Sequence, residues 1–399
     1  MKNLPGPTSV RLASIDIFRA LIMLLMIFVN DLWSLSGIPE WLEHTAANDD
    51  GMGLADVVFP AFLFIVGLSI PFAVQNRISK GESQTRIAAH ILLRSVALIV
   101  MGLFHVNFEN MAPALVPVSR PVFEIIMTIA FFLIWNVYPK EGKIRRLPVW
   151  WLQTAGIVVL VILAMIYRGG DAENPVWMRP YWWGILGLIG WAYLLGSLLY
   201  LVVRKRFWLI ILVVIVFQFL NFQEFSPLFG DLPRLKLIIS ASNYALVMSG
   251  VLASALLLQI PLKPGRQWIY FSILLLLGGL YIIYGFQVRP LDGISKIKAT
   301  PSWTSICAGL SFLAYAVIYL VTVKYSLTRW AKIIEPAGSM TLTCYLVPYL
   351  VYPILTLAGW QWPEFLSTGG VGLLKSFLFA MAVIWMAGLL GRMKIRLKI

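Results

Sequence analysis

The sequence predicts an all-α polytopic membrane protein, and its composition and hydropathy pattern support that fold class. The 399 residues are 60% hydrophobic, with a mean hydropathy of +0.83. Only 13% are charged, about half the share of a soluble domain. A soluble core of this size has no room for so many apolar side chains, so we expect lipid around much of the chain. Cys307 and Cys344 lie in apolar runs and predict buried side chains rather than a disulfide or zinc site.

Apolar residues gather into about twelve segments, most of them close to the ~20 residues that cross a bilayer. The first starts after Arg11 with no small-residue cleavage site behind it, so we interpret it as a retained helix rather than a signal peptide. Pro348 and Pro353 break the eleventh. The segments are 15–32, 55–74, 87–105, 121–138, 148–167, 181–203, 207–222, 237–260, 268–286, 303–323, 338–357 and 371–390.

Basic residues orient these segments. If the N-terminus is cytoplasmic, most of the 32 lysines and arginines fall in the cytoplasmic loops and termini, including the clusters at 140–146, 204–206 and 392–398. This is the positive-inside pattern, and it predicts both termini in the cytoplasm. It also accounts for the formal charge of +14 without a nucleic-acid partner. We expect a bacterial inner membrane, with the loop at 33–55 on the periplasmic side.

That first loop contains the stretch WLEHTAANDDGMGLADVVFP at 41–60, with His44 inside it. Between Asp31 and Asp56 the chain has no lysine or arginine. Its six carboxylates are Asp31, Glu40, Glu43, Asp49, Asp50 and Asp56. Such a field attracts a cation, such as a protonated amine, although the positive-inside rule alone also removes basic residues from this loop. Asp56 opens the second segment, where it is either a site residue or a carboxylate that stabilises a helix N-terminus.

Other polar residues lie within or beside the apolar segments, where ionisable groups are costly and often functional. Asp16 and Arg19 are three residues apart and share a helix face. They form either a structural ion pair or, with Arg94, a site for an anionic group that enters from the cytoplasm. Asn30 and Asp31 close the first segment, as helix caps or as site residues.

His105 and Glu109 are expected at the same membrane depth as the first loop. His105 is either a hydrogen-bonded structural residue or part of the site. Lys296 stands in a predicted outer loop, where it is solvated, faces the acidic loop, or faces an anionic substrate or cofactor. The chain has no Walker motif, no HExxH and no GxSxG elbow, which disfavours ATP-driven transport, zinc chemistry and serine hydrolysis.

Several stretches together resemble one family. They are RLASIDIFRALIMLLMIFVND at 11–31, the stretch from Trp41 to Arg77, ISKIKATPSWTSICAGLSFLAYAVIYLV at 294–321 and EPAGSMTLTCYLVPYLV at 335–351. The family is that of heparan-alpha-glucosaminide N-acetyltransferase, within a wider group of transmembrane acyltransferases. The resemblance implies one membrane domain with a ten-helix core at 12–180 and 237–399, and an inserted helix pair at 181–222. The acidic stretch TAANDDGMG departs from the family pattern.

The resemblance also implies a function: transfer of acetyl from cytoplasmic acetyl-CoA to the amine of an extracytoplasmic glucosamine-type sugar. His44 matches the catalytic histidine, and Asp56, Asn30 and Arg19 match other motif positions. An imidazole accepts protons near neutral pH, so His44 is either a general base or the nucleophile of an acetyl-histidine intermediate. Asp56 would orient it.

The predicted partners and sites follow from this function. We expect Asp16, Arg19 and Arg94 to bind acetyl-CoA, with no metal. The residues predicted to bind the amino sugar or glycan acceptor are Asn30, Asp31, Asp49, Asp50, His105, Glu109 and Lys296. Membrane lipid is the other expected partner, and the sequence leaves room for a homodimer. The alternatives are O-acetylation of a glycan or lipid-linked sugar, and a secondary transporter with charged residues on its solute path.

Overall fold

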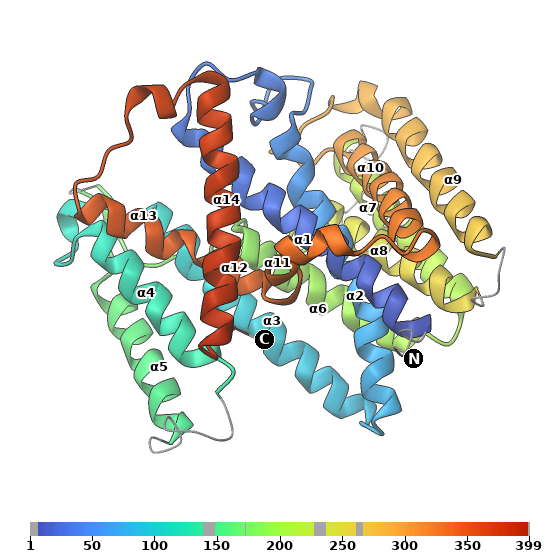
Figure 1. The fold of residues 1–399 in the computed structure, drawn as a ribbon, viewed down its shortest axis with the longest axis horizontal. Coiled ribbons are helices and arrows are strands. Elements are labelled where there is room, and N and C mark those ends of the chain that lie inside the picture. Colours follow the sequence, from blue (N-terminus) through green and yellow to red (C-terminus); the bar gives the residue numbers. More distant parts are fainter. Residues whose placement is uncertain (1–6, 139–147, 172, 227–236, 261–265, 398–399) are drawn as a thin grey trace.

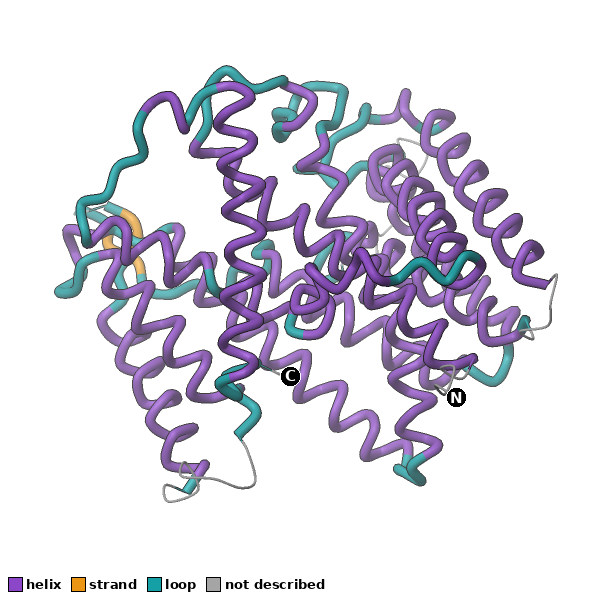
Figure 2. The backbone as a smooth tube through the Cα atoms, in the orientation of Figure 1, coloured by secondary structure: helices purple, strands orange, loops and turns teal. Residues whose placement is uncertain are grey.

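The computed structural model is a bundle of helices (Figure 1). It describes residues 7–138, 148–171, 173–226, 237–260 and 266–397. The basic residues at 140–146, with Lys2, Arg234, Lys236, Lys263 and Lys398, lie outside this part of the chain. Helices make up most of the trace, and the loops lie mainly at their ends (Figure 2). Strands β1 (Gly169–Gly170) and β2 (Pro175–Val176) form a small antiparallel pair.

Each predicted apolar segment contains a helix. The helices are α1 (Pro7–Asp31), α2 (Leu54–Ser79), α3 (Gln84–Glu109), α4 (Arg120–Trp135), α5 (Val149–Ile166), α6 (Ile185–Val203), α7 (Phe207–Phe225), α8 (Ala241–Gln259), α9 (Arg266–Gln287), α10 (Pro301–Tyr319), α11 (Glu335–Ser339), α12 (Thr341–Leu346), α13 (Pro348–Leu357) and α14 (Gly369–Arg392).

The membrane class is confirmed, but the number of candidate spans is lower than the predicted twelve. In the described ranges, 10 helices are long and apolar enough to cross a membrane. The number of candidate spans rises to 11 if one bent pair of helices is counted as a single span. The difference is α4, whose 16 residues are too short to count. The bent pair, Arg329–Ser339 with Thr341–Leu357, turns by 73°. The bend falls at Met340, and a second interruption at Val347 lies directly before Pro348, one of the two expected breaks, whereas α13 continues through Pro353.

Helices α2 and α8 meet backbone to backbone in the core. A Cβ on Gly67 would lie 1.9 Å from the carbonyl oxygen of Val247, and one on Gly250 would lie 1.9 Å from that of Phe64. Small residues commonly allow this close approach between membrane helices. Helix α2 continues from Leu54 to Ser79 although Pro60 and Pro71 lie inside it.

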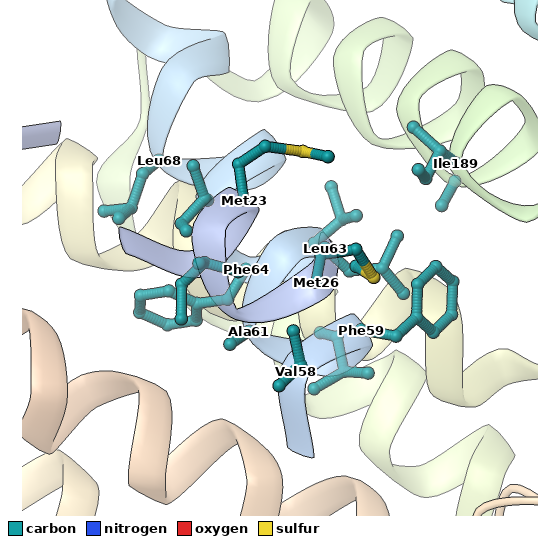
Figure 3. Close-up of a cluster of buried hydrophobic side chains, with 14 of the residues drawn as sticks. Met23, Met26, Val58, Phe59, Ala61, Leu63, Phe64, Leu68 and Ile189 are labelled. Carbon is teal, nitrogen blue, oxygen red and sulfur yellow. The ribbon is translucent and has the colours of Figure 1, made fainter. Parts of the chain in front are cut away.

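The core beside this contact joins α1, α2 and α6. Figure 3 shows Met23 and Met26 of α1 with Phe64 of α2 and Ile189 of α6. Helix α6 also packs on α3, and α4 packs between α5 and α13 at one edge of the bundle, while α9 covers α10 at the other (Figure 1). Ser36 pairs with Thr368, which brings the start of α14 beside the first loop. This frame positions the loop that carries His44.

Candidate active site

The loop between α1 and α2 folds back over the first turn of α2. Its 3₁₀ turn at Glu40–Leu42 buries Leu42, and the chain then returns to Gly53, which precedes the helix. A Cβ on Gly53 would lie 1.9 Å from the carbonyl oxygen of Glu43. Only glycine allows this approach without a shift of backbone. The approach places His44 next to the start of α2.

His44 and Asp56 form the closest polar pair of this loop. The Nδ1 atom of His44 lies 2.6 Å from Oδ1 of Asp56. The backbone amides of Thr45 and Gly53 each donate to Oδ2 of Asp56 at 3.0 Å. Asp56 is 1% exposed, whereas the His44 side chain is 51% exposed. Because a carboxylate accepts from Nδ1, we assign the neutral ring's proton to Nδ1, which leaves Nε2 able to accept a proton.

Lys296, from the loop between α9 and α10, completes this cluster. Its Nζ atom lies 3.2 Å from Nδ1 and 3.5 Å from Nε2 of His44, and 3.8 Å from Oδ1 of Asp56. Burial lowers the pKa of Lys296, and the Asp56 carboxylate opposes that shift. Lys296 therefore faces the first loop, which is one of the three alternatives that the sequence allowed. Lys298 pairs instead with Asp292 at 3.3 Å.

The same α9–α10 loop is fastened to the first loop at several points. Nε of Arg289 donates to Asp50 at 2.9 Å, and the amide of Ile294 donates to the other oxygen of Asp50 at 2.7 Å. The bond from Ile294, aided by Arg289, lowers the pKa of Asp50. Nε1 of Trp303 donates to the carbonyl oxygen of Asp56 at 3.2 Å. These contacts hold Lys296 in place beside His44.

The structure partly neutralises the acidic field of the first loop. Asp31 pairs with Lys375 at 3.1 Å, Asp50 with Arg289 at 2.9 Å, and Asp56 with Lys296 at 3.8 Å. These cations come from distant parts of the chain, so the loop's own lack of basic residues overstated its negative charge. Glu43 still lines the cavity described next.

A cavity of about 630 Å³, here called the His44 cavity, lies beside this cluster. Asn30, His105 and Glu109, three of the predicted acceptor residues, line it together with His44. The further lining side chains include Met23, Ile27, Leu32, Trp33, Glu43, Glu124, Ile185, Tyr345, Tyr349 and Tyr352. The cavity is thus lined by the first loop, by helices α1 and α3, and by the bent pair.

A second cavity of about 720 Å³, here called the Arg19 cavity, contains all three predicted acetyl-CoA residues, Asp16, Arg19 and Arg94. Arg19 donates to Asp16 at 2.9 Å and to Ser69 at 2.6 Å. The Arg94 guanidinium lies over the Tyr193 ring, 4.8 Å from its centroid. The lining also shares three side chains with the His44 cavity: Met23, Ile185 and Tyr345. The two cavities are therefore neighbours along α1.

The structure does not bring the remaining predicted acceptor residues to the cavity. Asp31 is buried and accepts from Tyr352 at 2.5 Å and from Ser376 at 2.6 Å, besides its ion pair with Lys375. It joins α1 to α13 and α14. Asp50 is used in the contact with the α9–α10 loop, and Asp49 is exposed in a turn.

Sequence reasoning missed several lining residues. Tyr345, Tyr349 and Tyr352 come from the bent pair, and their spacing of four and three residues is a helical-face signal that could have indicated them. Glu124 of α4 carried no comparable signal beyond being a carboxylate in an apolar segment. No group of three or more histidine, cysteine, aspartate or glutamate side chains able to hold a metal ion occurs in the described ranges.

Part of this chain is similar in sequence to known proteins. Residues 11–182 match the family model described as heparan-alpha-glucosaminide N-acetyltransferase, catalytic. Over 98 residues the chain is 39% identical to the heparan-alpha-glucosaminide N-acetyltransferase of Homo sapiens and 38% identical to that of Mus musculus. Each match covers 24% of this chain and 14% of the relative. The predicted resemblance is therefore confirmed for residues 11–182, which include the His44 loop and helices α2 to α5 and are similar to the catalytic region of the heparan-alpha-glucosaminide N-acetyltransferase family.

Proposed function

We propose that this protein is a membrane N-acetyltransferase that moves acetyl from cytoplasmic acetyl-CoA to the amine of an extracytoplasmic glucosamine-type sugar. The supporting observation is the His44–Asp56 pair on a cavity that adjoins the Arg19 cavity. The family match supports acetyl transfer. The proposed location is a bacterial inner membrane, with the His44 loop on the periplasmic side.

In the proposed reaction, the amine nitrogen attacks the thioester carbonyl carbon while Nε2 of His44 takes a proton from that nitrogen. The C–N bond forms, the C–S bond then breaks, and the leaving thiolate takes up the proton to give free CoA. Asp56 holds the imidazole by Nδ1 and stabilises its cationic form. The Lys296 ammonium lies beside the ring, where it can stabilise negative charge that develops on the carbonyl oxygen.

The arrangement of the two cavities supports entry of the donor from the other end of α1. Arg19 and Arg94 suit the phosphate groups of CoA because guanidinium groups bind phosphate well. Arg19 and Asn30 are eleven residues apart on α1, about 16 Å along a helix axis. The pantetheine arm would pass Met23, Ile185 and Tyr345 to bring the thioester to His44.

Purified protein in sealed liposomes tests this function. Radiolabelled acetyl-CoA is supplied on one side and glucosamine is enclosed on the other. We expect labelled N-acetylglucosamine to appear in the glucosamine compartment and CoA to be released in the donor compartment. Glucose, which offers only hydroxyl groups, is the matched acceptor for O-acetylation. Absence of transfer to either sugar from either side, with acetyl-CoA intact, would refute the proposal.

A further inference from the structure

The His44 cavity has a second polar wall that the reaction centre does not use. Helix α3 supplies His105 and Glu109 to this wall, and α4 supplies Glu124. His105 and Glu109 are four residues apart in one helix, so they lie on the same face. His44 and Asp56 belong to the loop and the start of α2, and their contacts involve none of these three side chains.

His105 is the most informative residue of this wall. Its side chain is 4% exposed, and neither ring nitrogen has a hydrogen-bond partner in the described parts of the chain. Aromatic rings hold it: Tyr349 stacks on it with centroids 4.3 Å apart, and Phe131 meets it edge-on at 5.5 Å. A neutral imidazole has one donor and one acceptor, and leaving both unused in a buried site is unfavourable. Since His105 lines the cavity, a ligand hydroxyl group there can supply a partner that the described residues do not.

The two glutamates add acceptors to the same wall. In the described ranges, neither Glu109 nor Glu124 lies within an ion pair. The charge of the neighbouring Arg120 acts on both glutamates, but its guanidinium lies 5.0 Å from the centroid of the Phe108 ring and makes no ion pair with either of them in the described ranges. Both carboxylates therefore keep their lone pairs for hydrogen bonds from a ligand. Tyr345 and Tyr349 add aromatic surface beside them.

We propose that His105, Glu109 and Glu124 form an acceptor subsite that binds the hydroxyl groups of a saccharide. A hydroxyl group both donates and accepts, which matches a neutral imidazole, and it donates strongly to a carboxylate. A simple alkylamine offers the reacting nitrogen but nothing for this wall. The inference rests on the proposed function, because it assigns the acceptor-binding wall of the same cavity.

The test compares two acceptors with rings of the same size. Glucosamine has both an amine and hydroxyl groups, whereas cyclohexylamine has only the amine. The variants are His105→Phe, which keeps a ring against Tyr349 but removes both nitrogens, and Glu124→Gln. Glu364→Gln, on an exposed turn that does not line the cavity, is the control. Glucosamine binding is measured by calorimetry without donor, and KM is measured for both amines with acetyl-CoA.

We expect His105→Phe and Glu124→Gln each to weaken glucosamine binding about tenfold, whereas Glu364→Gln should bind glucosamine as wild type does. The KM for glucosamine should rise at least ten times more than the KM for cyclohexylamine in both cavity variants. Acetyl-CoA affinity, measured on the same samples, reports that the variants are folded. Wild-type protein that binds no glucosamine, variants that bind it as wild type does, or equal losses for both acceptors would overturn the inference. If glucosamine binds through these residues but no amine is acetylated, the subsite stands and the proposed function fails.

Discussion

The Nδ1 atom of His44 lies 2.6 Å from the Oδ1 atom of Asp56, a buried carboxylate that also accepts hydrogen bonds from two backbone amides. These amides fix the carboxylate, and the carboxylate in turn fixes the imidazole. The exposed His44 ring is thus held by a rigid buried partner, with Nε2 on the side that can accept a proton.

Asp56→Asn should lower kcat by roughly 10²–10⁴-fold, because the amide cannot stabilise a cationic imidazole and can favour the wrong tautomer. The KM for acetyl-CoA should change little, since Asp56 does not line the Arg19 cavity. Steady-state kinetics on purified protein measure both constants. Asp49→Asn, at an exposed position in the same loop, serves as the control. A kcat for Asp56→Asn equal to that of the control would exclude this role.

Lys296 should set the alkaline limit of activity. Burial lowers its pKa, so its ammonium loses a proton at lower pH than an ordinary lysine at about 10.4. Activity that needs the cation is present below the lowered pKa and is lost as pH rises through it. Lys296→Arg should move this alkaline limb to higher pH because arginine stays charged, whereas Lys296→Met should lower kcat by roughly 10- to 1000-fold. Identical pH–rate profiles in wild type and Lys296→Arg would contradict this.

Gly53→Ala should disrupt the site while the bundle remains folded. The added Cβ would lie 1.9 Å from the backbone carbonyl of Glu43, so the loop must move away from α2 and His44 with it. We expect at least a tenfold loss of kcat, with little change in the thermal unfolding midpoint. Gly51→Ala is the matched control, because the nearest atom to its Cβ is a Thr45 methyl at 3.7 Å. Equal kinetics for the two variants would show that the close approach is unimportant.

Arg19→Gln should weaken donor binding rather than acceptor binding. The change removes the guanidinium from the Arg19 cavity and leaves Asp16 without its partner. We expect the KM for acetyl-CoA to rise about tenfold or more while the KM for glucosamine stays near the wild-type value. The double variant Asp16→Asn, Arg19→Gln removes the unpaired carboxylate and isolates the loss of the cation. A larger rise in the glucosamine KM would place the donor elsewhere.

Much of the fold was predictable, because lipid forces apolar residues into runs of helical length. The His44–Asp56 pair was also accessible, since both residues lie in one short segment. The contact of Lys296 with His44 was not, because it joins residues 252 apart through loops that carry no periodic signal. The same holds for the Asp31–Lys375 pair. The interruption before Pro348 was predictable because proline is a known helix breaker, whereas the bend at Met340 was missed because the residue there is neither proline nor glycine.

The role of His44 is tested most directly by acetyl transfer from radiolabelled acetyl-CoA to glucosamine, catalysed by purified wild type, His44→Ala and His90→Asn. His90 is an exposed histidine of α3 that does not line the His44 cavity, so its variant controls for loss of an imidazole. We predict rapid transfer by wild type and His90→Asn, and a rate at least ~10³-fold lower for His44→Ala. Full activity in His44→Ala, or a comparable loss in His90→Asn, would contradict the assignment of His44 as the catalytic group.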